Sequence, residues 1–184
     1  MTRVAILFTV AGAAMAATLA ARAQTIDLPP RKPGQWDMRM VTEKPAGGPG
    51  FSAQMCIDAA TDKDLMNFGL KVSKDSCKRY DVKRAGAAWL IDAECTFGPV
   101  KSATKTTISG DFQSSITVRV EGTTEGIPGA GSGPQSTLIT QTAKWTGACA
   151  DAMRPGDIIL GGGIKMNVKQ IKELQKMLPN VQIK

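Results

Sequence analysis

Histidine is absent from all 184 residues. This absence limits the possible catalytic and metal-binding sites of the chain more than any motif does. Without an imidazole, serine–histidine and cysteine–histidine nucleophile pairs are excluded, as are the metal sites that need histidine, which include most zinc enzymes. No recognised catalytic motif takes their place. We therefore expect a protein that is not an enzyme and that holds neither a metal nor a cofactor.

Other signals of function are missing as well. The chain has no Cys-x-x-Cys pair, which argues against a thioredoxin-like redox centre. Its lysines are scattered rather than clustered between aromatic residues, so no nucleic-acid partner is expected. Asp92 and Glu94 share the water-facing side of a strand, and nothing marks them as catalytic. The aspartates near residue 60 lack the spacing of an EF-hand calcium loop. They are Asp58, Asp62 and Asp64.

The first thirty residues have the order of a secretory signal peptide. Arg3 gives a short positive start, an apolar run follows from Val4 to about Leu19, and small residues stand at Ala21 and Ala23. We place the cleavage after Ala23, so that residues 1–23 are the expected signal peptide. An uncleaved anchor is disfavoured because the run is short for a bilayer span of about 20 residues. A periplasmic or secreted protein is expected, without stable membrane insertion after cleavage.

Four cysteines remain in the mature chain, and export makes two disulfides the expected state of Cys56, Cys77, Cys95 and Cys149. Three connectivities are open. A turn at Ala85-Gly86 would bring Cys77 opposite Cys95 if the loop has three residues, and one position away if it has two. We prefer Cys56 with Cys77 and Cys95 with Cys149, because the first pair would tie down the helix expected between them.

Alternating apolar and polar residues predict about seven strands. The strand-like runs cover residues 36–40, 51–57, 78–84, 87–94, 100–109, 114–122 and 136–145. Short turns between these runs favour an antiparallel meander, strongly curved or rolled into a partial barrel. The fold class is therefore mainly β. We expect an extended proline-rich arm at 24–35 and a disulfide-bonded β domain at 36–150.

Two helices are predicted beside the strands. The first is short and follows the second strand, with Thr61 and Asp64 as its cap and Gly69 as its end. The second is an amphipathic helix in the C-terminal extension at 151–184, capped by Asn167 and packed on the β domain. Its apolar positions are Val168, Ile171, Leu174, Met177 and Leu178. The glycines at 161–163 predict a flexible hinge before it.

The assembled motifs resemble the proteobacterial family catalogued as domain of unknown function 3617. The resemblance rests on "PGQWDMRM", "CIDAATDKDL", "SCKRYDVKRAGAAWLIDAEC", "SGDFQSSITVRVEG" and "AKWTGAC", which occur in that order over about residues 33 to 150. It implies an exported protein of the cell envelope. It implies no enzyme activity, substrate or cofactor that could be assigned to a residue of this chain.

Two hypotheses for function follow. In the first, the curved sheet is a non-catalytic binding module for a small apolar ligand or an envelope protein partner, and the nine methionines suit an adaptable apolar surface. The residues expected on that face are Trp36, Met38, Met40, Trp89, Ile116 and Val118. The alternative is a structural or stress-associated envelope protein whose basic surface meets anionic lipid or polysaccharide. Its lysines would be Lys169, Lys172 and Lys176.

Overall fold

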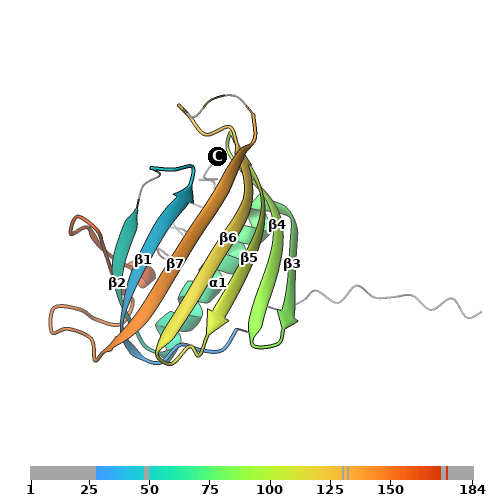
Figure 1. Ribbon diagram of the computed structural model, residues 1–184. Helices are drawn as coiled ribbons and strands as arrows, with labels where there is room; N and C mark the ends of the chain where they lie inside the picture. Colours follow the sequence, from blue (N-terminus) through green and yellow to red (C-terminus); the bar gives the residue numbers. More distant parts are fainter. Residues whose placement is uncertain (1–27, 48–49, 130, 132, 171–172, 174–184) are drawn as a thin grey trace, which may run out of the picture.

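The computed structural model describes residues 28–47, 50–129, 131, 133–170 and 173. These residues form one antiparallel sheet of nine strands, with a helix along its concave side (Figure 1). Across the sheet the strands follow the order β3-β4-β5-β6-β7-β1-β2-β8-β9, so the sheet is open and β3 and β9 are its edges. The elements are β1 (Gly34–Lys44), β2 (Phe51–Ile57), α1 (Ala59–Ser76), β3 (Cys77–Ala85), β4 (Ala88–Phe97), β5 (Val100–Gly110), β6 (Ser115–Glu125), β7 (Gln135–Gly147), β8 (Asp157–Leu160) and β9 (Lys165–Asn167).

The curved antiparallel sheet predicted from the sequence is confirmed, and the seven predicted strands are β1 to β7. Strands β3 to β7 form the meander, whereas β1 pairs with both β2 and β7 and so adds the first hairpin at the β7 side. At Gly122 the strands β5 and β6 approach so closely that a Cβ atom would overlap the carbonyl oxygen of Ala103. A glycine is therefore required at this point of the sheet.

Strands β8 and β9 are not predicted by the sequence pattern. They form a hairpin that pairs with β2 through β8. The flexible hinge predicted at 161–163 is wrong, because these glycines make the hairpin turn: the Leu160 amide donates to the Ile164 carbonyl at 2.8 Å, and Gly162 has a positive φ of 97°. Strands of four and three residues are too short for alternation to reveal them.

The predicted C-terminal helix falls mostly outside the described residues. Its start is described: the helix begins at Val168, and the Asn167 side chain accepts a hydrogen bond from the Lys169 amide at 2.9 Å. That contact is the one expected of an N-cap. Val168 is only 1% exposed, so this first residue packs into the protein. Residues 171–172 and 174–184, which carry the rest of the predicted apolar face, lie beyond the described part.

Helix α1 runs across the concave side of the sheet, from the end of β2 to the start of β3 (Figure 1). In the sheet order, β2 and β3 are six strand spacings apart, which is about 29 Å on a flat sheet at about 4.8 Å per spacing. An 18-residue helix spans about 27 Å. Helix α1 is therefore about as long as the distance across the sheet from β2 to β3, and it crosses the concave side between these two strands.

The cap of α1 differs from the prediction. Asp58 and Thr61 form a capping box, in which the Thr61 amide donates to Asp58 Oδ1 at 2.8 Å and the Asp58 amide donates to Thr61 Oγ1 at 2.9 Å. The predicted cap of Thr61 with Asp64 and the predicted end at Gly69 are both wrong. A glycine inside a helix costs about 1 kcal/mol relative to alanine. The helix continues through Gly69 because contacts with β2 at one end and with β3 and β4 at the other hold it in place.

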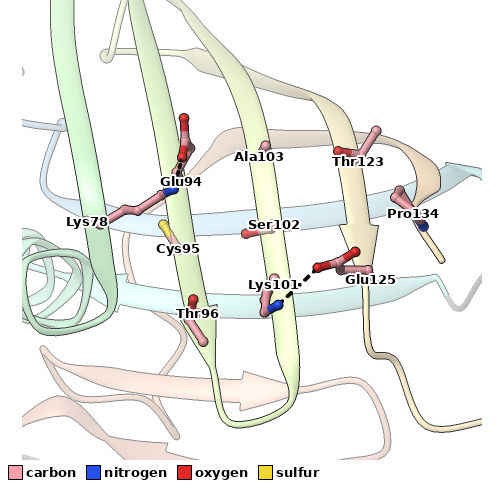
Figure 2. A pocket seen from close by; sticks show the side chains of 10 residues that line it. All are labelled: Lys78, Glu94, Cys95, Thr96, Lys101, Ser102, Ala103, Thr123, Glu125 and Pro134. Carbon is pink, nitrogen blue, oxygen red and sulfur yellow. Dashed lines mark ion pairs between the residues drawn. The ribbon is translucent and has the colours of Figure 1, made fainter.

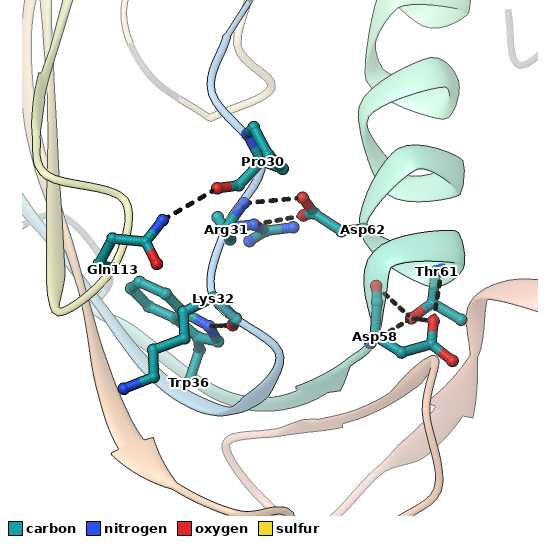
Figure 3. A network of polar contacts seen from close by, with 8 residues as sticks. All are labelled: Pro30, Arg31, Lys32, Trp36, Asp58, Thr61, Asp62 and Gln113. Atoms are coloured by element: carbon teal, nitrogen blue, oxygen red, sulfur yellow. Dashed lines mark hydrogen bonds and ion pairs between the residues drawn. The ribbon is translucent and has the colours of Figure 1, made fainter.

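The segment before β1 closes one end of the sheet. Arg31 donates from its backbone amide and its Nε to the carboxylate of Asp62, at 3.0 and 2.6 Å, and Asp62 is only 3% exposed (Figure 3). The Lys32 amide donates to the Phe112 carbonyl, and Trp36 Nε1 donates to the Lys32 carbonyl. Residues 28–33 are thus clamped between α1 and the β5–β6 turn. We call this the closed end of the sheet, and the end with the β4–β5 turn the open end.

The main core lies at the closed end. Its buried residues are Trp36, Met55, Ile57, Trp89, Phe112, Ile116 and Ala143. Phe112 reaches this core from the β5–β6 turn, where it has a positive φ of 58°, and its ring stacks edge-on against Trp89 with the centroids 5.3 Å apart. Leu65 of α1 packs against the same cluster. Helix, sheet and turn therefore share one apolar centre.

The two disulfides expected from the sequence are present, but their pairing corrects our preference. Cys77 is joined to Cys95, and Cys56 to Cys149. The turn after Ala85 has two residues, which would leave Cys77 one position out of register with Cys95. A β-bulge between Cys77 and Arg79 adds the missing residue and brings the two cysteines face to face.

Asp157 holds the β8–β9 hairpin together, and we predict that its protonation destabilises the protein in acid. Its carboxylate accepts hydrogen bonds from the Asn167 side chain, the Lys165 ammonium and the Arg154 amide, each at 2.8 Å. Burial works to raise the pKa of Asp157, but these bonds outweigh burial and lower the pKa from 3.8 to about 2. The stabilisation is therefore complete above pH ~4 and is lost as the pH falls towards 2.

The measurement is the free energy of unfolding by urea between pH 2 and pH 6. We expect Asp157→Asn to be less stable than the parent at pH 6 by about 2 kcal/mol and to lose less stability in acid. Hydrogen bonds also lower the pKa values of Asp58, at the start of α1, and of Asp111, in the β5–β6 turn, so these carboxylates should preserve part of the acid sensitivity in the variant. An unchanged pH profile in Asp157→Asn would contradict this account.

Candidate functional site

The face of the sheet that meets α1 can be identified from the strand register, because directly opposite residues point to the same side. Trp36, Met55 and Ile116 of this face form the core with Leu65 of α1. We call this face the concave face. Its residues include Trp36, Met38, Met40 and Thr42 of β1; Phe51, Ala53 and Met55 of β2; Val82 and Arg84 of β3; Trp89, Ile91, Ala93 and Cys95 of β4; Ser102, Thr104, Thr106 and Ile108 of β5; Ile116, Val118, Val120, Gly122 and Thr124 of β6; and Gln135, Thr137, Ile139, Gln141, Ala143 and Trp145 of β7.

All six residues predicted for the apolar ligand face lie on the concave face, but they divide into two groups. Trp36, Trp89 and Ile116 are 0%, 6% and 8% exposed and belong to the closed core, so they are not accessible to a ligand. The other three are half-buried. They are Met38, Met40 and Val118. The accessible part of the predicted face is therefore this second group.

Burial decreases from the closed end to the open end along β1 and β6, whereas on β4 the inward residues stay buried as far as Ala93. In β6, Ile116 is buried, and the inward residues from Val118 to Thr124 are all half-buried. In β1, Trp36 is fully buried and the inward residues Met38 and Met40 are half-buried. On α1, Gly69 lies one helical turn beyond Leu65 and is exposed, and a Cβ atom there would meet no atom within 4 Å. The space between α1 and the sheet is filled at the closed end and accessible towards the open end.

Charge is separated between the two faces of the sheet. All charged residues of β1, β4, β5, β6 and β7 point away from α1. They are Asp37, Arg39, Glu43, Lys44, Asp92, Glu94, Lys101, Lys105, Arg119, Glu121, Glu125 and Lys144. In the edge strand β3, Arg84 is opposite Trp89 at the closed end, with its guanidinium 5.0 Å from the ring. The half-buried surface next to Met40 and Val118 therefore carries no charge from these five strands.

Polar groups without charge gather at the open end of the concave face. Ala93, Thr104, Gly122 and Thr137 lie side by side across four strands, and the next such row is Cys95, Ser102, Thr124 and Gln135. The hydroxyl groups of Thr124 and Thr137 are 2.7 Å apart and hydrogen-bonded. The alternation of apolar and polar residues did not identify these hydroxyl groups as part of a site. In β6 the inward residues change from Val118 and Val120 to Thr124, and this change along one strand is the sequence signal that could have identified them.

A basin of about 480 Å³ lies at the open end, lined mostly by outward-facing residues of β4, β5 and β6 and also by Cys95 and Ser102 (Figure 2). Its charges compensate one another: Lys78 pairs with Glu94 at 2.6 Å, and Lys101 with Glu125 at 3.4 Å. A hydrogen bond and the charge of Lys78 lower the pKa of Glu94, so this acid stays ionised. The carboxylates of Asp92 and Glu94 point outward, as the alternation predicts. The charged residues that line the basin are therefore all paired with one another.

Other features of the described residues narrow the choice of site. No group of three or more Cys, Asp or Glu residues in the described part could hold a metal ion. Among the described helices, none combines the length and the apolar composition needed to cross a membrane. Of the three lysines in the alternative hypothesis, Lys169 is exposed, and Lys172 and Lys176 are outside the described residues. The concave face is therefore the candidate site that the described residues define best.

Comparison with protein families gives one match. The model of a family described as "Protein of unknown function (DUF3617)" matches residues 31–149, which is more than half of the 184 residues. The match includes strands β1 to β7, helix α1 and all four cysteines, and it ends before the β8–β9 hairpin. Neither the curated proteins nor the solved structures contain a match to this chain.

Proposed function

The chain belongs to the DUF3617 family of proteins of unknown function, and on that premise we propose that it is a non-catalytic binding module for a small apolar ligand. The ligand would lie on the concave face, next to Met38, Met40 and Val118. One observation carries the proposal: large apolar side chains point into the space between the sheet and α1, yet they remain half-buried. Apolar surface that a fold keeps accessible on a concave face is typical of a ligand site.

The oxidation state of the cysteines bears on the compartment in which the protein is found. Both disulfides are formed, which indicates an oxidising, non-cytoplasmic environment. Together with the signal-like N-terminal sequence, this supports our inference that the protein is exported to the cell envelope. A ligand-binding protein in that compartment would meet envelope lipids and their fragments.

A pair of adjacent substitutions tests the binding site. Met40 points to the concave face, and its neighbour Val41 points outward and is 42% exposed. Titration with an uncharged fluorescent naphthylamine probe should give saturable binding to the parent. We expect Met40→Lys to weaken this binding about tenfold or more, because the ammonium group would be desolvated beside the ligand. Val41→Lys adds the same charge on the opposite face and should leave the affinity unchanged.

Two controls keep this test decisive. Near-ultraviolet circular dichroism confirms that each variant is folded, and Met40→Thr replaces Met40→Lys if the lysine variant is not. Equal losses of affinity in the Met40 and Val41 variants would show that the probe binds elsewhere. A parent protein that does not bind the probe would refute the proposed function. Binding to anionic vesicles alone would favour the alternative basic surface.

A further inference from the structure

We propose that the ligand is a single-chain amphiphile with an uncharged, hydrogen-bonding head group, such as a monoacylglycerol. This inference rests on the proposed function and specifies the chemical class of its ligand. The alkyl chain would lie along Met38, Met40 and Val118, pointing to the closed end. The head group would lie at the open end, among the hydroxyl groups of β5, β6 and β7.

The concave face becomes more polar from the closed end to the open end. Across β5, β6 and β7, the row nearest the core is Ile108, Val118 and Gln141, and the next is Thr106, Val120 and Ile139. The following row is Thr104, Gly122 and Thr137, and the last is Ser102, Thr124 and Gln135. Apolar side chains therefore give way to hydroxyl and amide groups over these rows. A molecule that is apolar at one end and polar at the other matches this sequence of rows.

The dimensions suit an extended alkyl chain. Val118 and Thr124 are six residues apart on β6, which corresponds to about 20 Å at about 3.4 Å per residue. Gly122 lies between them on the inward side and carries no side chain that could extend from β6 towards the ligand. A medium-length acyl chain can reach from the threonine rows to Val118 without entering the closed core.

The lack of charge on the concave face selects against ionic head groups. An ionised group that leaves water for a partly buried site loses several kcal/mol unless an opposite charge receives it. The lysines of the neighbouring strands point outward, and Arg84 lies at the closed end over Trp89. Strands β5, β6 and β7 therefore offer no charged partner to a carboxylate or ammonium head group at the open end.

The hydroxyl groups at the open end can receive an alcohol or ester. A threonine hydroxyl has one donor and two acceptor sites, and the Thr124–Thr137 hydrogen bond uses one donor and one acceptor. The pair can therefore offer a second donor and further acceptor sites to a ligand. The uncharged side chains of Ser102 and Gln135 lie in the same row as Thr124.

Three ligands with the same chain length test the head-group preference. Monodecanoylglycerol, decyl sulfate and decyltrimethylammonium would each be titrated against the parent loaded with the naphthylamine probe, below their micelle concentrations. We expect monodecanoylglycerol to displace the probe with an affinity about tenfold higher than either ionic ligand. Equal affinities would overturn the head-group inference and leave the proposed apolar site standing. Absence of probe binding would instead refute the site itself.

Two adjacent variants locate the head group. Thr124→Val removes a hydroxyl group from the concave face, whereas Thr123→Val removes one from the opposite, exposed face. We expect Thr124→Val to weaken monodecanoylglycerol binding about threefold to tenfold and to leave probe binding unchanged. No change in Thr124→Val would overturn the assignment of the head group to the open end.

A truncated chain tests whether the C-terminal segment occupies the concave face instead of a ligand. If a chain that ends before Ile171 binds the probe much more tightly than the parent, the C-terminal segment is the occupant, and the proposal of an amphiphile is overturned.

Discussion

Replacing Cys56 and Cys149 together by alanine should lower the free energy of unfolding by about 4 to 5 kcal/mol. The bridge joins residues separated by 93 positions and ties β2 to the segment after β7, so its loss frees a long loop in the unfolded chain. Cys56 is also fully buried, with its carbonyl accepting a hydrogen bond from the Gly156 amide. Urea unfolding monitored by circular dichroism measures the change.

The second disulfide provides the matched control. Cys77 and Cys95 are separated by 18 positions and close only the β3–β4 hairpin, so their double replacement by alanine should cost about 3 kcal/mol. We therefore expect the Cys56/Cys149 variant to be the less stable of the two. The opposite order would contradict the structural account of these bridges. A non-reduced digest that yields a Cys56–Cys77 peptide would contradict the pairing itself.

Trp36→Ala should be the most damaging single substitution in the core, with a loss of about 4 kcal/mol. Trp36 is 0% exposed, lies opposite both Met55 and Trp145, and donates from Nε1 to the Lys32 carbonyl at 2.8 Å. Its removal would leave a large cavity and release the segment that closes this end of the sheet. The measurement is again the free energy of unfolding by urea.

Trp36→Phe separates the two contributions of this side chain. The phenyl ring retains most of the packing, but the Lys32 carbonyl loses its indole donor, so we expect a loss of only about 1 to 2 kcal/mol. If Phe were as damaging as Ala, the hydrogen bond rather than the packing would dominate. If neither substitution changed stability, the closed end would not be the core.

The strands could be predicted because their signal is local. Alternation over five or more residues identified all of β1 to β7 and placed Met38, Met40 and Val118 on a common face. The disulfide pairing could not be predicted in the same way. Cys77 faces Cys95 only because of a one-residue bulge near Lys78, and the alternation of residues gives no sign of that bulge. The length of α1 also escaped prediction, because contacts at both ends override the preference of Gly69 to end a helix.

The candidate site was only partly predictable for a related reason. The period of two assigns a residue to a face, but it does not say which part of that face is covered. Trp36, Trp89 and Ile116 are covered by Phe112 and Leu65, which come from a turn and a helix and not from the alternating strands. The adjacent rows that hold Thr104 with Thr137 and Ser102 with Thr124 can be recognised only when the strand register is known.

The central claim is that an apolar ligand binds the concave face, to which β1 and β4 to β7 contribute no charge, rather than the charged outer face. The affinity of the naphthylamine probe for Met40→Lys relative to Val41→Lys tests it most directly, because the two lysines differ only in the face from which they project. The account predicts binding that is about tenfold weaker for the Met40 variant. Equal affinities, or weaker binding by the Val41 variant, would contradict it.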